Sequence, residues 1–159
     1  NFQELNALSL PSIAVIDGPA IGGGFELALA CDLRLASSEV FVQLPETGLG
    51  LIPGAGGTQR LPRIVGESTA KEWIFTGKKV KADEAQARGA INKIHEDVNQ
   101  LREDWIEKLL DQSSPAVSLA KQSINEGLEV SLEEGLQIEQ DRYRQTFEYE
   151  DRYQAQDDF

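Results

Sequence analysis

Three consecutive glycines, followed at once by an apolar run that contains one carboxylate, limit most strongly what this chain can fold into. Gly22 to Gly24 precede the run Phe25 to Cys31, in which Glu26 is the only polar residue. Glycine adopts backbone angles that other residues avoid, which suits a tight turn into a helix. A carboxylate in an apolar helix is costly unless it is neutralised, paired or used. The pattern therefore predicts a glycine turn and a largely buried helix that carries Glu26.

A second carboxylate, Glu46, follows a proline. Two carboxylates beside exposed backbone N–H groups are the parts of a water-addition site, because one can take a proton while the other gives one. Other interpretations stay open for each part. Glu46 can be a loop carboxylate that caps nearby N–H groups, Glu26 can lie partly exposed on its helix, and the glycines can form a turn and nothing more.

A glycine-rich loop, Pro53 to Gly57, runs into a helix expected from Gly57 or Thr58 to Val65. Such a loop suits a ligand that approaches the N-terminus of the helix, although a flexible loop with a cap is the plainer interpretation. The glycine triplet has neither the G-x-G-x-x-G spacing of a dinucleotide site nor the G-K-[ST] of a P-loop.

The net charge of −12 argues against nucleic acid and anionic membranes as partners, since both attract basic surfaces. No run of 18 apolar residues occurs, so no transmembrane helix is expected. Cys31, the single cysteine, is interpreted as a small buried hydrophobe, and His95, the single histidine, as an exposed loop residue. No cluster has metal-ligand spacing, and we expect neither a metal nor a redox cofactor.

The expected elements change character near residue 97. Before it, strands at Ser12 to Ile16, Asp32 to Ala36 and Val40 to Gln43 alternate with helices, which is typical of the α/β class. After it, apolar residues recur at helical spacing from Leu101 to Phe147, with Trp105 and Leu128 among them. The apolar surface of these helices is larger than the small α/β part can cover, so it predicts an oligomer interface.

Capping residues predict where three helices begin. Ser68 is expected to cap one helix, and Ser114, directly before Pro115, is expected to cap another. Ser131 and Glu134 have the spacing of a capping box, in which each residue satisfies a backbone N–H of the other.

Several stretches, in order and at matching spacing, resemble the enoyl-CoA hydratase/isomerase (crotonase) family. Within this family, the sequence of these stretches is most similar to the methylglutaconyl-CoA hydratase-like subgroup. The similarity reaches from Ala14 to about Arg152. Its main stretches are Ala14 to Gly18, Gly22 to Ala28, Ala30 to Arg34, Pro45 to Leu61, Phe75 to Gly77 and Ala82 to Ala90.

The resemblance implies a role for each candidate site residue. Glu26 and Glu46 match the two catalytic glutamates, and Gly23 matches an N–H donor of the oxyanion hole. Gly54 matches a glycine at the N-terminus of a helix that points at the thioester carbonyl, and Gly22 adjoins the same substrate-binding region. Coenzyme A is then part of the substrate, with no separate cofactor and no metal.

The fold implied is the C-terminal part of the crotonase ββα superhelix. Residues 1–97 would form a partial core that carries the glutamates. Residues 98–159 would form a helical region that assembles a homotrimer or a dimer of trimers. The family's N-terminal half, which holds a further oxyanion donor and the loop around the nucleotide of coenzyme A, has no counterpart in this sequence, and neither has its basic C-terminal tail. We therefore expect the chain alone to be inactive.

The activity implied is that of a lyase that hydrates the 2,3 double bond of an enoyl-CoA thioester, in fatty-acid or branched-chain amino-acid catabolism. A double-bond isomerase is the alternative enzyme, and it needs only one carboxylate. An alternative of another class is a truncated assembly piece without catalysis. The sequence does not choose between the bacterial cytoplasm and the mitochondrial matrix, and it does not show which glutamate is the acid.

Overall fold

The computed structural model describes residues 2–149, which divide into two compact units. Of these residues, unit 1 holds 2–7 and 12–105, and unit 2 holds 8–11 and 106–149. The division falls within one helix, α6 (Val98–Leu110). In the described part of the chain, no helix is long and apolar enough to cross a membrane.

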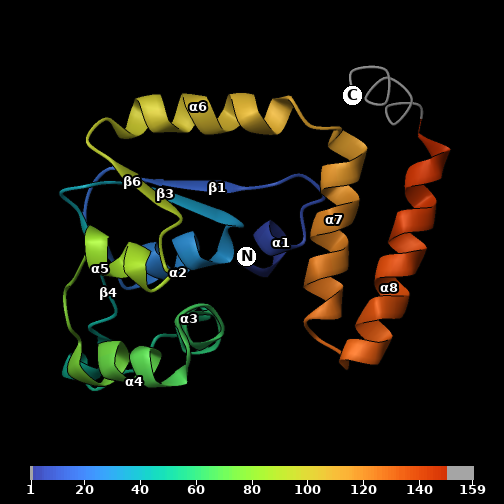
Figure 1. The fold of residues 1–159 in the computed structure, drawn as a ribbon. Coiled ribbons are helices and arrows are strands. Elements are labelled where there is room, and N and C mark those ends of the chain that lie inside the picture. Colours follow the sequence, from blue (N-terminus) through green and yellow to red (C-terminus); the bar gives the residue numbers. More distant parts are fainter. Residues whose placement is uncertain (1, 150–159) are drawn as a thin grey trace. The chain divides into compact units, whose positions relative to one another are not determined.

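Unit 1 is built on two small sheets, which Figure 1 shows among its helices. The first has the order β1-β3-β6 with all strands parallel, so that Ile16 pairs with Ala36 and Ser37 with His95. In the second, β4 pairs in parallel with β2 and antiparallel with β5. The strands are β1 (Ile13–Ile16), β2 (Ala20–Ile21), β3 (Leu33–Ser37), β4 (Phe41–Gln43), β5 (Val80–Lys81) and β6 (Lys93–His95).

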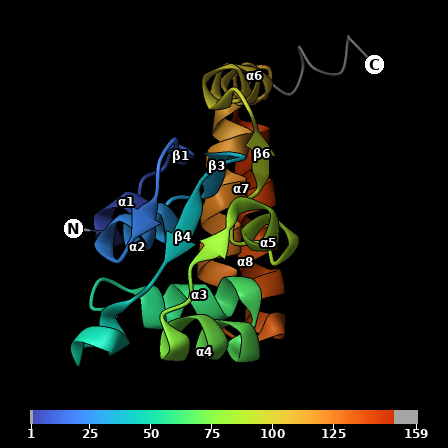
Figure 2. The same cartoon turned by 90° about the vertical axis from the view of Figure 1, so that its left-hand side faces the viewer.

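Helix α2 (Gly23–Ala30) lies at the centre of the core of unit 1. Phe25, Ala28 and Leu29 are buried there and belong to one cluster with residues of both sheets and of three further helices, α3 (Gly57–Val65), α4 (Glu67–Thr76) and α5 (Ala82–Ala87). Figure 2 shows α3 and α4 lying next to each other. Unit 1 also holds α1 (Phe2–Asn6), the 3₁₀ helix η1 (Glu46–Leu49) and the first part of α6.

Two charged side chains fix the C-terminal end of α2. Asp32 Oδ2 accepts hydrogen bonds from the backbone N–H and the hydroxyl of Ser12, at 2.6 and 2.8 Å, which joins the starts of β3 and β1. The buried Arg34 donates from Nη1 to Cys31 O at 2.7 Å and from Nε to Ala90 O at 2.9 Å. The carbonyls at a helix C-terminus lack partners inside the helix, and Arg34 supplies one. Burial lowers the pKa of the Arg34 guanidinium.

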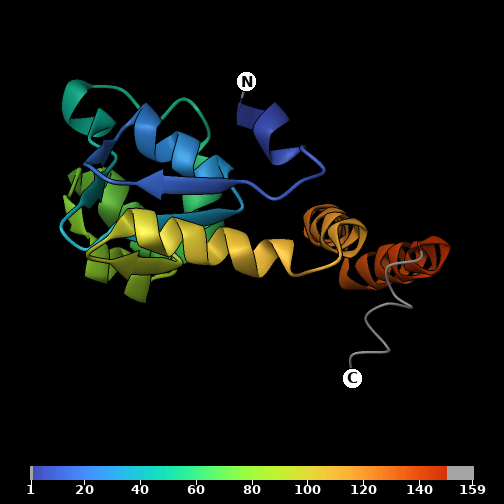
Figure 3. The same cartoon turned by 90° about the horizontal axis from the view of Figure 1, so that it is seen from above.

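Unit 2 is a helical hairpin of α7 (Ser114–Gly127) and α8 (Leu132–Gln145), which lie side by side in Figures 1 and 3, followed by the 3₁₀ helix η2 (Thr146–Glu148). The backbones meet where a Cβ on Gly135 would lie 3.5 Å from Gly127 Cα. No residue of α8 is buried in this chain, although Leu132, Leu136 and Tyr143 are on it.

The expected helices and strands match the structure at most positions, and the mixture of parallel strands and helices confirms the expected α/β class. The Ser131–Glu134 capping box is confirmed. Two expected caps are wrong. Gly66, not Ser68, caps α4, and Ser113, not Ser114, caps α7, with its hydroxyl accepting from Ala116 N. The two-residue strands β2 and β5 were not expected, because two residues are too few to show an alternating pattern.

Candidate functional site

Glu26 lies in the first turn of α2 and is 3% exposed. Its Oε1 accepts hydrogen bonds from the backbone N–H of Ala55 at 2.8 Å and of Gly57 at 2.7 Å. Hydrogen bonds to an ionised acceptor are stronger than those between neutral groups, so a carboxylate here holds the glycine loop firmly. The Glu26 carboxylate was expected to be neutralised, paired or used, and it is paired with two backbone N–H groups.

Gly57 is a glycine because the approach of Glu26 leaves no room for a side chain. A Cβ at this position would lie 2.9 Å from Pro53 Cβ, 3.0 Å from Glu26 Oε1 and 3.1 Å from Leu44 Cδ1. Gly57 is also the first residue of α3, where N–H groups lack partners within the helix. The start of α3 is thus occupied by a carboxylate of this chain.

Glu46 begins η1 and points toward the start of α2. A Cβ on Gly22 would lie 2.9 Å from Glu46 Oε1. Gly22 has φ +55° and ψ −126°, an arrangement that glycine adopts far more readily than other residues. Glu46 Oε2 is buried, and it has no hydrogen-bond partner within residues 2–149. Buried polar atoms are nearly always paired, so this oxygen is a candidate to meet a ligand or water.

The N–H groups of the three glycines are of two kinds, one used within the fold and two at the start of the helix. The N–H of Gly22 donates to Gln43 O at 2.9 Å, so it is used within the fold. Gly23 and Gly24 form the first turn of α2, where helix geometry gives their N–H groups no carbonyl to bind. Both are exposed, and a Cβ on either would meet nothing within 4 Å. Exposed residues whose backbone N–H groups have no carbonyl partner in the helix are what an oxyanion hole requires.

Gly54 lies in the loop before α3, a helix that was expected to begin at Gly57 or Thr58. It is exposed, and α3 begins three residues later, after the left-handed Gly56. The N–H groups that this loop directs at a carboxylate are those of Ala55 and Gly57. Sequence reasoning missed this contact, and the one signal for it was a second glycine, Gly57, at the first position of the helix after Gly56.

The first turn of α2 brings the two carboxylates into one region of unit 1. Glu46 Oε1 lies against Gly22, and Gly22 O accepts from Glu26 N at 3.0 Å, one helical turn along. Gly23, between Gly22 and Glu26 in the chain, is exposed. Two carboxylates and exposed backbone N–H groups at the start of one helix can together bind a polarised carbonyl and move protons beside it.

The single histidine and the single cysteine are not among the residues at the start of α2 that contact Glu26 or Glu46. His95 ends β6, is exposed and has Nδ1 within 3.1 Å of Asp97 N. Cys31 follows α2, is half-buried and donates from Sγ to Leu27 O at 3.6 Å. Across the part of the chain that the structure describes, no group of three or more His, Cys, Asp or Glu residues could hold a metal ion.

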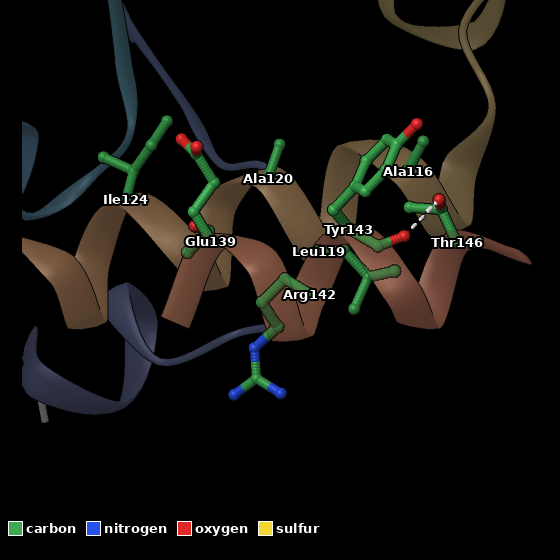
Figure 4. Close-up of a pocket in the computed structure, with 9 residues that line it drawn as sticks. Ala116, Leu119, Ala120, Ile124, Glu139, Arg142, Tyr143 and Thr146 are labelled. Atoms are coloured by element: carbon green, nitrogen blue, oxygen red, sulfur yellow. Dashed lines mark hydrogen bonds between the residues drawn. The ribbon is translucent and has the colours of Figure 1, made fainter. Parts of the chain in front are cut away.

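A groove of about 320 Å³ lies between α7 and α8 in unit 2. In Figure 4, Tyr143, Ala116 and Thr146 gather at one end and Ile124 and Glu139 toward the other. Its lining is mostly apolar and contains neither Glu26 nor Glu46. The groove has the character of a packing surface rather than of a reaction site.

Comparison with known proteins identifies the family. The sequence model described as enoyl-CoA hydratase/isomerase matches residues 1–159. A probable mitochondrial enoyl-CoA hydratase 2 of Arabidopsis thaliana is 46% identical over 157 residues, which are 97% of this chain and 52% of that protein. The mouse mitochondrial methylglutaconyl-CoA hydratase is 47% identical over 161 residues, covering 97% of this chain and 51% of that protein.

Solved structures agree with the sequences. An enoyl-CoA hydratase from Bacillus anthracis superposes with a TM-score of 0.93 at 42% identity, over 98% of this chain and 61% of that one. The chain spans about half the length of the curated relatives it matches. The shared sequence, the shared fold and the ordered motifs lead to one conclusion, that the chain belongs to the enoyl-CoA hydratase/isomerase family.

Proposed function

We propose that the whole protein that carries these residues hydrates the 2,3 double bond of an enoyl-CoA thioester. The observation that supports this most is the approach of Glu46 to Gly22, the N-cap of α2, because the first turn of that helix carries Gly23 and Glu26. A double-bond isomerase needs one carboxylate to move a proton, so a pair favours addition of water.

The proposed reaction assigns each group one task. As the oxygen of water bonds to C3, electrons move to the thioester oxygen, and the N–H of Gly23 stabilises that charge by about 3 kcal/mol. One glutamate takes a proton from the water, and the other gives a proton to C2 as the thioester carbonyl re-forms. We assign the proton donation to Glu46, whose Oε2 is buried without a partner among the described residues.

The test measures three reactions of the whole protein under the same conditions. Hydration of crotonyl-CoA and of 3-methylglutaconyl-CoA is followed by loss of enoyl absorbance, and isomerisation of a 3-enoyl-CoA by its gain. We expect hydration to exceed isomerisation. The branched substrate is included because the mouse relative at 47% identity is named for it. Isomerisation without hydration would contradict the proposal, and no turnover of any substrate would favour a non-catalytic assembly role.

Gly22→Ala is expected to lower the hydration rate about 10-fold or more, because small displacements of a reacting group are costly. The new methyl group would come within 2.9 Å of Glu46 Oε1, and the flexible end of that side chain would have to move. Steady-state kinetics of the whole protein measure the effect. The matched control is Gly66→Ala, since Gly66 also has positive φ (+84°) but a Cβ there meets nothing within 4 Å. Equal losses in both variants would show that backbone strain, and not Glu46, is responsible.

We propose that the helices from Leu101 to Phe147 make the contacts of a trimer or a dimer of trimers. Leu128 and Leu132, near the turn of the hairpin, are 78% and 80% exposed in the single chain. Contiguous exposed apolar surface of this kind marks an interface. Light scattering of the whole protein should show an oligomer that Leu128→Glu with Leu132→Glu dissociates, while Phe75→Glu, on the comparably exposed α4 surface, does not. A monomer at every concentration would refute the assembly.

A further inference from the structure

The segment that carries Glu46 is tied to the end of α4 on both sides of that residue. Before Glu46, Gln43 Nε2 donates to Gly77 O at 2.7 Å. After it, Thr47 Oγ1 donates to Ile74 O at 2.7 Å. Both acceptors belong to the last turn and cap of α4, where carbonyls have no partner within the helix.

Packing reinforces these two hydrogen bonds. Gly77 caps α4 with φ +57°, and a Cβ on it would lie 3.4 Å from Pro45 Cα, so the chain directly before Glu46 rests against this turn. The backbone of Gln43 makes a third connection, because its carbonyl accepts the N–H of Gly22 at 2.9 Å. Gln43 therefore links the end of α4 to the glycine that faces the Glu46 carboxylate.

We propose that Gln43 and Thr47 are positioning residues that fix the Glu46 carboxylate against Gly22. This inference rests on the proposed function, in which Glu46 gives a proton to C2. Both hydrogen bonds end on backbone of α4, and neither side chain is assigned a contact with substrate. Their loss would let η1 shift, and a shift of about 1 Å at a reacting group can cost about 10²-fold in rate.

The test is Thr47→Val, which keeps the shape of the side chain and removes the hydroxyl. We expect kcat of the whole protein for crotonyl-CoA to fall about 10-fold while KM stays within about 2-fold, because a proton transfer is lost and binding is not. Thr47→Ser, which keeps the hydroxyl, should restore kcat. Gln43→Met tests the other side of Glu46 independently and should reproduce the fall in kcat if Thr47→Val does not fold.

The matched control is Thr76→Val on the same helix. Thr76 Oγ1 donates to Glu72 O at 2.6 Å, so this variant also removes one hydrogen bond from a threonine hydroxyl to an α4 carbonyl, but one that holds nothing near Glu46. Thermal unfolding should change similarly in both valine variants, whereas kcat should fall only in Thr47→Val.

A double-mutant cycle separates positioning from general stability. In a Glu46→Gln background, Thr47→Val should lower kcat no further, since the group that it positions has been removed. An independent loss in both backgrounds would overturn the inference, and so would an unchanged kcat in Thr47→Val. If the unmodified whole protein hydrates no enoyl-CoA, the proposed function is refuted, and the positioning role with it. If it hydrates crotonyl-CoA and Thr47→Val retains kcat, only the positioning role falls.

Discussion

Replacing Glu46 by glutamine in the whole protein is expected to lower crotonyl-CoA hydration by about 10²-fold or more, the usual scale for a lost general acid or base. Glutamine keeps the shape of the side chain and can still lie beside Gly22, so the loss reports on the proton and not on packing. The measurement is the initial rate of loss of enoyl absorbance at saturating substrate, with circular dichroism to confirm the fold.

The control for this substitution is Glu39→Gln, which makes the same chemical change at an exposed position before β4. Its rate should match that of the unmodified protein. A rate near the unmodified value for Glu46→Gln would reject the role of this carboxylate in the reaction, whatever its position in the fold.

The second large effect concerns the 159-residue chain by itself, which we expect to show no measurable hydration of crotonyl-CoA. The resemblance to the family implies that a further oxyanion donor and the loop around the nucleotide lie in a part that these residues do not include. One lost donor costs roughly 10²–10³ in rate. Lost binding energy from the distant end of coenzyme A costs more, since that energy helps to position the reacting carbons.

This expectation is tested on the purified chain, with its ends confirmed by mass spectrometry and the whole protein assayed alongside. Turnover by the chain at a rate comparable to the whole protein would show that the groups of unit 1 suffice. The Gly23 donor and the two carboxylates would then need no help from outside these residues.

Local signals in the sequence predicted most of what lies within one element. The glycine triplet and the apolar run foretold α2 and the burial of Glu26, and the Ser131–Glu134 spacing foretold the start of α8. The expected start of α4 at Ser68 was wrong because the preceding glycine, Gly66, already ends α3 and caps α4, so no serine cap is needed.

Contacts between distant elements were beyond the sequence. Glu26 meets Ala55 and Gly57 across 29 and 31 residues, and nothing local to either segment states that they touch. The hydrogen bond from Thr47 to the carbonyl of Ile74, which joins η1 to α4, was equally hidden. A threonine after a glutamate has no local sequence signal that distinguishes it from an ordinary loop residue. Such contacts depend on how the elements pack, which composition and periodicity do not encode.

Ionic strength should have little effect on the hydrogen bonds by which Arg34 holds the end of α2. Dissolved salt screens charges that water surrounds, such as the pair Lys78–Glu84 at the surface, and acts much less on charges enclosed by protein. Arg34 is enclosed, and its side chain donates hydrogen bonds to the backbone carbonyls of Cys31 and Ala90. The helix that presents Gly23 and Glu26 therefore keeps its anchor from dilute buffer to concentrated salt, while the surface ion pairs around it weaken.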